Sequence, residues 1–234
     1  MHRFPNLSVS AKPSLVRSYA TRASRISRAQ RRAYSDYAPD WVIPFKKGRI
    51  SWDAIYPNDN RRIVEIGFGM GEGTKNLATR HPTWSILGIE VYKPGIGKLL
   101  WWINQEDLKN IRIIEHDAVE VVREMLAERS VDGYHIWFPD PWPKRRHQKR
   151  RLIDTEFVEL LSRTLKPGAY IHIATDWEPY AEQILDLLEG TEGLKNRCEK
   201  WSPKPNYRPS TKFEERGLAE NRIIRDIVFE SDKL

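Results

Sequence analysis

The sequence contains a single cysteine, Cys198, which cannot form a disulfide within the chain. A chain without an internal disulfide fits a reducing compartment, so a cytoplasmic protein is expected. Cys198 has no set of Cys or His ligands near it, and no metal site is predicted. No apolar run approaches the roughly 20 residues of a membrane-spanning helix, so no membrane association is expected.

Acidic residues are missing from residues 1–35, which hold eight of the 39 Lys and Arg residues. The other 31 basic residues nearly balance the 32 acidic ones, so the net charge of +7 arises in this N-terminal arm. Such basic arms are typical of nucleic-acid-binding proteins. An Arg-rich segment without acids is also typical of organelle transit peptides, and an unstructured tail is a third interpretation. Composition alone leaves these three interpretations open, and with them organelle targeting.

The length of 234 residues allows one domain, or one domain and an arm. We predict a basic arm at residues 1–35 and one domain at residues 36–234. Strands are expected at residues 63–66, 85–91, 111–115, 134–138, 169–174 and 223–230. Helices are expected at residues 74–80, 99–106, 118–129, 154–165 and 178–189, and irregular segments at 36–60 and 202–217. This alternation of strands and helices predicts an α/β fold with a parallel sheet.

The first expected strand leads into a loop with glycines at positions 67, 69, 71 and 73. Such a loop brings backbone N–H groups against a ligand. The third glycine of a dinucleotide-binding loop would stand where the chain has Glu72 or Thr74, and no phosphate-binding Gly-Lys-Ser/Thr motif is present. Glu65, just before the loop, would repel a phosphate and suit a cation such as a sulfonium or an amino group. A nucleotide-dependent oxidoreductase is therefore the less favoured interpretation.

Four acids stand at or near the ends of four successive expected strands: Glu65, Glu90, Asp117 and Asp140. In open α/β sheets the ligand crevice lies outside the carboxyl ends of the strands. Glu90 has about the spacing of an acid that binds ribose hydroxyls, and Asp117 could accept from an adenine amino group. Together the four describe an adenosine ligand with positive charge, such as S-adenosylmethionine. Glu90 or Asp117 could instead cap the helix that follows it.

Asp140 stands between Pro139 and Pro141 and is followed by the flat ring of Trp142. Proline fixes its own φ and favours an extended conformation in the residue before it, so a stiff turn is expected here. Six of the eight residues in 144–151 are Lys or Arg. A rigid acid beside an aromatic ring and a basic cluster suggests a site that holds a nucleic-acid base. The alternative is a proline-rich turn followed by a solvated basic helix start.

Six segments resemble, in the same order, the bacterial TrmB family of tRNA (guanine-N7)-methyltransferases. They are VEIGFGMGEGT, GIEVYKPGIG, HDAVEV, FPDPWPKRRHQKRR, ATDWEPYAE and RPSTKFEERG. The resemblance runs from about Arg17 to the C-terminus, and FPDPW and TKFE are its specific parts. It implies a Rossmann-like class I S-adenosylmethionine-dependent methyltransferase fold, with a mostly parallel seven-stranded sheet and helices on both faces. It also implies methylation of the guanine at position 46, in the variable loop of tRNA.

The resemblance implies a role for each matching residue. The implied contacts to S-adenosylmethionine are Glu65, Gly67, Gly69, Glu90, Asp117 and Asp140, with Asp140 also the catalytic residue. The implied contacts to the target guanosine are Lys144, Asp176, Thr211, Lys212, Phe213 and Glu214. The implied contacts to the rest of the RNA are Arg146, His147, Gln148, Lys149, Arg150 and Arg151. The resemblance also favours RNA contact over targeting for the basic segment 17–32.

Two positions depart from the family pattern. Asn221 and Arg222 stand where the family usually has a Gly-His pair, and residue 143 is Pro where relatives often have His. The first departure concerns the geometry near the C-terminal strand.

Guanine N7 carries a free lone pair, so methylation at N7 needs no base to remove a proton from it. Catalysis should then consist of positioning and of stabilising the positive charge that grows on the ring. Asp140 and Asp176 are expected to serve these ends, and one carboxylate can accept from guanine N1–H and N2–H. Glu214 could replace Asp176 in this role, and the sequence does not rank the two. Stacking on the base is expected from Trp142 or Phe213.

Other interpretations remain open at this point. One is a non-catalytic RNA-binding protein with an inactive methyltransferase core, and another is a methyltransferase for a different RNA or for a small molecule. The intact acids disfavour the first, and the basic arm disfavours a small-molecule substrate. The segment 202–217 is expected to fold over the base only when RNA is present. The sequence does not distinguish a monomer from a homodimer.

Overall fold

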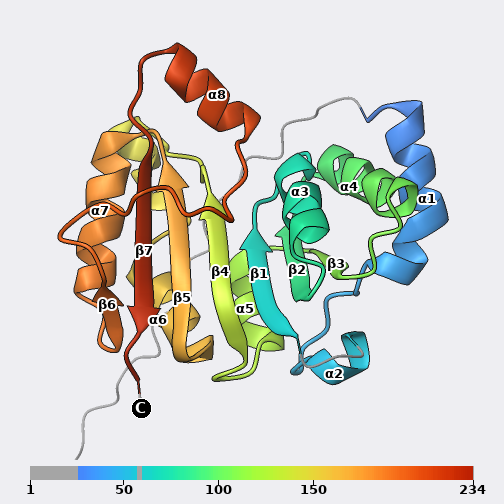
Figure 1. Ribbon diagram of the computed structural model, residues 1–234, viewed down its shortest axis with the longest axis horizontal. Coiled ribbons are helices and arrows are strands. Elements are labelled where there is room, and N and C mark those ends of the chain that lie inside the picture. The colour runs from blue at the N-terminus through green and yellow to red at the C-terminus, as the bar shows by residue number, and fades with distance from the viewer. Residues whose placement is uncertain (1–25, 57–59, 234) are drawn as a thin grey trace, which may run out of the picture.

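The computed structural model describes residues 26–56 and 60–233. Seven strands form one sheet in the order β3-β2-β1-β4-β5-β7-β6 (Figure 1). The strands are β1 (Arg61–Ile66), β2 (Trp84–Glu90), β3 (Ile111–Glu115), β4 (Val131–Trp137), β5 (Leu165–Thr175), β6 (Leu194–Asn196) and β7 (Arg225–Ser231). The pairings from β3 to β5 are all parallel, and β7 pairs antiparallel with both β5 and β6. The predicted mostly parallel α/β fold is confirmed.

Helices cover both faces of the sheet (Figure 1). They are α1 (Arg28–Trp41), α2 (Trp52–Ile55), α3 (Glu72–Arg80), α4 (Lys93–Gln105), α5 (Ala118–Met125), η1 (Arg145–Arg150, a 3₁₀ helix), α6 (Thr155–Thr164), α7 (Glu178–Glu189) and α8 (Lys212–Ala219). Along β1, Ile63 packs in the core with α1, α3 and α4, and Val64 packs in the core with α5, α6 and α7. This division follows because successive side chains of a strand point to opposite faces.

Two segments that were expected to be irregular contain helices. Segment 36–60 includes the C-terminal part of α1 and all of α2, and segment 202–217 includes most of α8. Helix α1 continues through Pro39, which lies in its last turn and supplies no backbone N–H there. Its start carries a capping box, in which Ser27 accepts from the backbone N–H of Gln30 and the Gln30 side chain accepts from that of Ser27. Helix α6 ends at Thr164, one residue before the expected end at residue 165, and β5 begins directly after it.

Helix α1 is packed into the domain rather than standing apart from it. A Cβ atom at Gly97 of α4 would lie 2.5 Å from the backbone oxygen of Gln30, so the glycine permits a close helix contact. The boundary predicted between residues 35 and 36 therefore falls inside a packed helix. Residues 1–25 of the predicted arm lie outside the described residues, and contact of this segment with RNA stays a prediction. Within the described ranges, no helix is both long and apolar enough to cross a membrane.

Candidate active site

The predicted site residues gather at the carboxyl ends of the parallel strands, the upper edge of the sheet in Figure 1. Glu65 lies at the end of β1 and Glu90 ends β2. Asp140 follows β4, and Asp176 follows β5. Because β4 lies between β1 and β5, this edge brings together residues that are far apart in the sequence.

The glycine-rich loop between β1 and α3 depends on left-handed backbone conformations. Gly69 has a φ of +57°, which few side chains tolerate. Its N–H donates to Oε2 of Glu90 at 2.8 Å. A Cβ atom at Gly95, near the start of α4, would lie 1.7 Å from the carbonyl oxygen of Gly69. The loop therefore lies directly on the start of α4, and glycine is required on both sides of the contact.

Glu65 is a buried acid with an unsatisfied oxygen. Glu65 is only 4% exposed, and its Oε2 has no hydrogen-bond partner among the described residues. Burial, opposed by the nearby Thr74 hydroxyl and supported by the Glu90 carboxylate, raises the pKa of Glu65 to about 8. Such a group fits a ligand that brings a hydrogen-bond donor or a positive charge to the loop, as the amino group and sulfonium of S-adenosylmethionine would.

Glu90 and Asp117 both bind backbone N–H groups. Glu90 accepts from Gly69, and its Oε1 accepts from Val91 at 2.7 Å and from Tyr92 at 3.0 Å. Asp117 is the N-cap of α5, and its Oδ1 accepts from the backbone N–H of residues 119 and 120. The capping interpretation is thus observed for Asp117. It does not exclude ligand contact, because an ionised carboxylate has about four acceptor positions.

The negative charge of Asp140 acts on Glu90, the acid that ends β2. Burial raises the pKa of Glu90, backbone hydrogen bonds oppose that shift, and the negative charge of Asp140 adds to it. Glu65 and Glu90 are coupled in the same way. Three of the four predicted acids therefore share one electrostatic environment, whereas Asp117 is fixed at the start of α5.

The turn around Asp140 is strained on both sides. Phe138 has a φ of +56° and Trp142 a φ of +43°, which are unfavourable for bulky side chains. The expected extended conformation at Phe138 is therefore wrong, and β4 ends one residue earlier, at Trp137. The backbone N–H of Phe138 donates to the carbonyl of Ala174 at 2.7 Å, which holds the strained residue against β5. Strain of this kind is concentrated at functional sites, and it leaves the Asp140 carboxylate exposed to solvent.

The basic segment after this turn divides into exposed and buried residues. Lys144, Arg146 and Lys149 are exposed along η1. Arg151, which was predicted to contact RNA, is 6% exposed and donates from Nε to the carbonyl of Pro141 at 2.9 Å. Its guanidinium also lies over the ring of Tyr180 at 4.6 Å. The prediction for Arg151 needs correction, since this side chain holds the Asp140 turn from inside.

The remaining residues of the predicted RNA contact line η1. His147 meets the ring of Trp142 edge to face at 5.9 Å, and the guanidinium of Arg150 lies 5.2 Å from the same ring. Gln148 is exposed. These side chains lie together beside Asp140, and their contact with RNA stays a prediction.

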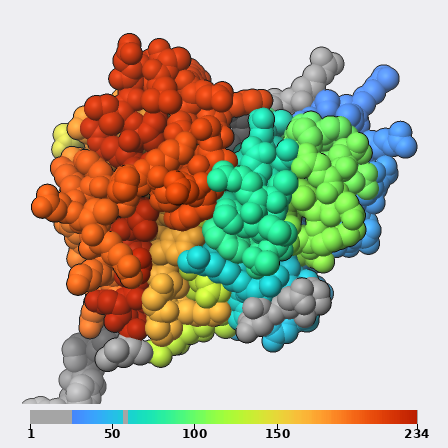
Figure 2. Space-filling model, in the orientation of Figure 1, coloured from blue at the N-terminus to red at the C-terminus, as the bar shows by residue number. Residues whose placement is uncertain are grey.

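The segment that leads into α8 touches the glycine loop. A Cβ atom at Gly73 would lie 3.5 Å from the ring of Pro209, and the ammonium of Lys212 pairs with Glu72 at 3.5 Å. Figure 2 shows this orange-red segment reaching the blue-green surface of α3. The structure thereby joins the predicted cofactor loop to the predicted guanosine-binding residues.

The four residues of TKFE have different environments. Thr211 is the N-cap of α8 and accepts from the backbone N–H of Glu214 at 3.2 Å. Phe213 is 62% exposed, and its ring stacks with that of Phe138, with centroids 6.4 Å apart. Sequence reasoning missed α8, although Thr-x-x-Glu is a recognised signature of a helix start.

Glu214 is buried and fully engaged. Its two oxygens accept from the guanidinium of Arg208, each at 2.9 Å, and Lys204 donates to the same carboxylate at 2.9 Å. Burial would raise the pKa of Glu214, but these hydrogen bonds outweigh it and leave the pKa below its ordinary value. Arg208 also donates to Asp226 at 3.1 Å, and Asp226 bonds the buried His172 at 2.8 Å.

This buried network bears on two expectations from the sequence. Glu214 has its oxygens committed to protein partners, and Asp176 is paired with Arg222, so the choice of carboxylate for guanine stays a prediction. The segment that was expected to fold only over RNA is already held in place by buried charges of the chain itself.

Comparisons with known proteins agree with this geometry. Residues 59–227 match the sequence model of a family described as "Putative methyltransferase". A tRNA (guanine-N(7)-)-methyltransferase of Paraburkholderia xenovorans is 50% identical over 92% of this chain and 82% of its own. One of Burkholderia ambifaria is 51% identical over 92% of this chain and 84% of its own. This chain belongs to the tRNA (guanine-N7)-methyltransferase family. The resemblance found in the sequence is confirmed.

Solved structures confirm the fold of this family member. The 16S rRNA methyltransferase KamB superposes with a TM-score of 0.59 at 11% identity, over 82% of this chain and 99% of that one. An rRNA methylase from Streptococcus thermophilus superposes with a TM-score of 0.52 at 12% identity, over 90% of this chain and 100% of that one. At such identities the likeness shows the fold alone, which is the Rossmann-like class I methyltransferase fold.

The departure from the family pattern at Asn221 and Arg222 has a clear structural outcome. Asn221 has a φ of +55°, and asparagine tolerates this left-handed conformation better than most residues do. The N–H of Arg222 donates to the carbonyl of Gly217 at 2.8 Å, which closes the end of α8. The guanidinium of Arg222 then pairs with Asp176 and with Glu220. Sequence reasoning noted Arg222 only as a departure and did not place it in the site.

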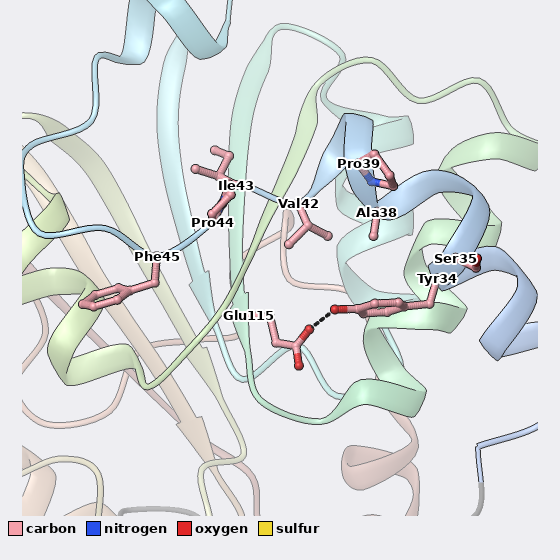
Figure 3. A pocket seen from close by; sticks show the side chains of 9 residues that line it. All are labelled: Tyr34, Ser35, Ala38, Pro39, Val42, Ile43, Pro44, Phe45 and Glu115. Atoms are coloured by element: carbon pink, nitrogen blue, oxygen red, sulfur yellow. Dashed lines mark hydrogen bonds between the residues drawn. The ribbon is translucent and has the colours of Figure 1, made fainter.

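A separate pocket lies at the outer edge of the sheet, next to β3 (Figure 3). It has a volume of about 510 Å³ and is lined by residues 34, 35, 38, 39, 42–45 and 115. The hydroxyl of Tyr34 donates to Glu115 across it. None of the residues implied by the family resemblance lines this pocket. It is therefore distinct from the candidate active site.

Proposed function

We propose that the protein transfers the methyl group of S-adenosylmethionine to N7 of guanine 46, in the variable loop of tRNA. Family membership supports the reaction type. The observation that carries the proposal is the contact between the glycine loop and the α8 segment, beside the strained turn of Asp140. This contact supports the proposal, because direct methyl transfer requires the cofactor and the base to be held next to each other.

The chain has suitable groups for the cofactor. Glu65 would accept from the amino group, the loop at Gly67 and Gly69 would hold the methionine end, and Glu90 would hold the ribose hydroxyls. Asp117 would lie at the adenine. When bound, S-adenosylmethionine supplies an electrophilic methyl group, which the guanine N7 lone pair takes while the carbon–sulfur bond breaks and a neutral thioether is left.

The protein's part in the transfer is positioning and electrostatics. Guanine N7 loses no proton, and the base becomes a cation when it is methylated. The exposed carboxylate of Asp140 would stabilise that charge. Asp176 would accept from guanine N1–H and N2–H, and the exposed ring of Phe213 would stack on the base.

Exposed cations beside the site would bind the tRNA backbone. Lys144, Arg146 and Lys149 lie on the outer side of η1, close to Asp140 in the chain. Lys and Arg that neutralise phosphates release counterions, so the affinity should fall with salt. A tRNA substrate also supports the cytoplasm as the site of action.

The test is methyl transfer from labelled S-adenosylmethionine to an unmodified tRNA transcript, with the product mapped by N7-methylguanosine-specific strand cleavage. A transcript with guanine 46 replaced by adenine is the matched control. We expect cleavage at position 46 in the first transcript and none in the second. Labelled RNA without that cleavage would overturn the assigned target, and no label at all would overturn the activity.

A further inference from the structure

The end of α8 places a second charged group on the guanine side of the site. Arg222 pairs with Asp176, the carboxylate assigned to guanine, and with Glu220. The side chain of Arg222 is 34% exposed and that of Asp176 is 17% exposed. A guanidinium has five N–H donors, so these two pairs leave donors for a ligand.

The Asp176–Arg222 pair is held firmly against the sheet. A Cβ atom at Gly217 of α8 would lie 3.2 Å from Oδ2 of Asp176, so the helix backbone passes directly beside this carboxylate. Helix α8 is in turn anchored by the buried pairing of Glu214 with Arg208. The position of Arg222 is therefore set by the same network that sets the position of Phe213.

The pair has the hydrogen-bonding pattern that complements one edge of guanine. That edge presents the O6 acceptor next to the N1–H and N2–H donors. A carboxylate accepts from the two N–H groups, and a guanidinium beside it donates to O6. Adenine would place an N–H₂ group against the guanidinium and a ring nitrogen lone pair against the carboxylate. Both contacts would then be lost, and a site built to hydrogen-bond one base discriminates against a base that cannot make those bonds.

The charge balance is also compatible with catalysis. The guanidinium lies between two carboxylates, so the group of Arg222, Asp176 and Glu220 carries a net negative charge. It therefore does not oppose the cation that forms on the methylated base. Binding at O6 and the N1 edge leaves N7 free for methylation.

We propose that Arg222 is a specificity-determining residue that donates to guanine O6, and that Asp176 and Arg222 read this edge of the base together. The inference rests on the proposed function. It concerns a position where the chain departs from the Gly-His pattern of its family.

The experiment compares three bases at position 46 of the transcript: guanine, inosine and 2-aminopurine. Inosine lacks only the N2 group, which Asp176 binds. 2-Aminopurine lacks O6 and the N1–H, so it removes the contact assigned to Arg222 and one of those assigned to Asp176. The ratio of kcat/KM for guanine to that for 2-aminopurine therefore contains the contribution of Arg222.

In Arg222→Gln we expect the guanine to 2-aminopurine ratio to fall about tenfold and the guanine to inosine ratio to stay unchanged. Arg222→Lys keeps a cation with less suitable geometry. Its guanine to 2-aminopurine ratio should lie between those of wild type and Arg222→Gln. Arg216→Gln is the matched control, because Arg216 pairs with the same Glu220 but is 75% exposed on α8. It should leave both ratios unchanged.

The outcomes separate the two proposals. If wild type methylates guanine 46 and Arg222→Gln keeps the guanine to 2-aminopurine ratio, Arg222 does not read O6 and only supports the fold. A fall of both ratios together would also overturn the assignment, since it would mean that Asp176 was displaced. If wild type does not methylate guanine at all, the proposed function fails, and the role of Arg222 fails with it.

Discussion

Asp140 is presented by a turn whose backbone is strained at Phe138 and at Trp142. The strain is maintained by contacts outside the turn, chiefly the hydrogen bonds to Ala174 and from Arg151. A residue held in this way can be aligned with its target without the entropic cost of ordering it during the reaction.

Replacing Asp140 with Asn should lower kcat by about a hundredfold, because the carboxylate charge that stabilises the methylated base is removed. Single-turnover methyl transfer to tRNA measures the effect. Asp107→Asn, at an acid whose side chain is 80% exposed, should have the wild-type rate. A wild-type rate in Asp140→Asn would exclude the catalytic role of Asp140.

Glu65 should couple cofactor binding to proton release. Burial raises its pKa from 4.5 to about 8, so the folded chain without ligand holds this proton at neutral pH. The contribution of Glu65 to the free energy of unfolding is thus fully present below about pH 4.5, and it is lost as the pH rises through about 8. A cationic ligand favours the ionised form, so S-adenosylmethionine should bind more tightly as the pH rises from about 6 to about 8.

Calorimetric titration with S-adenosylmethionine in two buffers of different ionisation enthalpy measures the released proton directly. We expect a fraction approaching one proton at pH 7. Glu65→Gln should bind more weakly and release none. Equal binding heats in both buffers for wild type would show that Glu65 keeps its proton in the complex.

At the scale of secondary-structure elements, α8 and η1 carry groups that are predicted to contact the substrate, and each is anchored by a buried arginine. Arg208 holds α8 through Glu214, and Arg151 holds the turn before η1 through Pro141. In the sequence, Arg151 belongs to the basic segment 144–151 and Arg208 belongs to the motif RPSTKFEERG. Their burial depends on α7, β5 and β7, which lie elsewhere in the chain.

Removing the charge of Glu214 should destabilise α8. Glu214→Gln leaves the guanidinium of Arg208 buried with fewer partners, which should cost about 3 kcal/mol of unfolding free energy. Glu215→Gln, at the exposed neighbouring residue, is the matched control and should change little. Urea unfolding measures both variants. An unchanged midpoint in Glu214→Gln would mean that the buried pair does not anchor the helix.

The same network predicts acid sensitivity. The pKa values of Glu214 and Asp226 are lowered, because hydrogen bonds from Arg208, Lys204 and His172 outweigh the effect of burial. Groups with a lowered pKa stabilise the fold above their ordinary pKa, and that stability is lost as the pH falls through the folded-state pKa.

The exposed and buried cations of the basic segment should respond differently to substitution. Lys149→Ala should weaken tRNA binding and reduce the slope of log Kd against log salt by about one. Arg151→Ala should instead lower the melting temperature, because it removes the support of the Pro141 carbonyl. Lys195→Ala, on β6, is the control for binding. A full salt slope in Lys149→Ala would exclude phosphate contact by Lys149.

At the scale of the whole molecule, the excess positive charge is concentrated in one part of the chain. Residues 1–35 hold the excess positive charge, and the rest is nearly neutral overall. The predicted cofactor-binding and guanosine-binding residues all lie at positions 65–214. The basic N-terminal segment is therefore the main candidate for long-range attraction of tRNA.

Deletion of residues 1–25, which hold five Lys and Arg residues, should weaken tRNA binding and reduce its salt dependence. The affinity for S-adenosylmethionine should stay unchanged, because the predicted cofactor residues all lie at positions 65–140. Filter binding at several salt concentrations and calorimetric titration measure the two quantities. Unchanged tRNA affinity in the truncated protein would exclude the arm as an RNA contact.

The sequence by itself determined the parallel α/β order, the placement of acids at the strand ends and the family. These features depend on local patterns: the alternation of strands and helices, the glycine loop, and motifs such as FPDPW. Strand ends could be assigned to within a few residues because β-branched runs end where glycine or acids begin.

Only the tertiary structure decided which charged residues are partners of one another. Arg151 and Glu214 look like surface or ligand groups in the sequence, yet both are buried, since their partners come from distant segments. The pairing of Arg222 with Asp176 joins residues 46 positions apart through the end of α8. The physical reason is that the cost of burying a charge depends on the groups that surround it in the fold, and no local pattern specifies those groups.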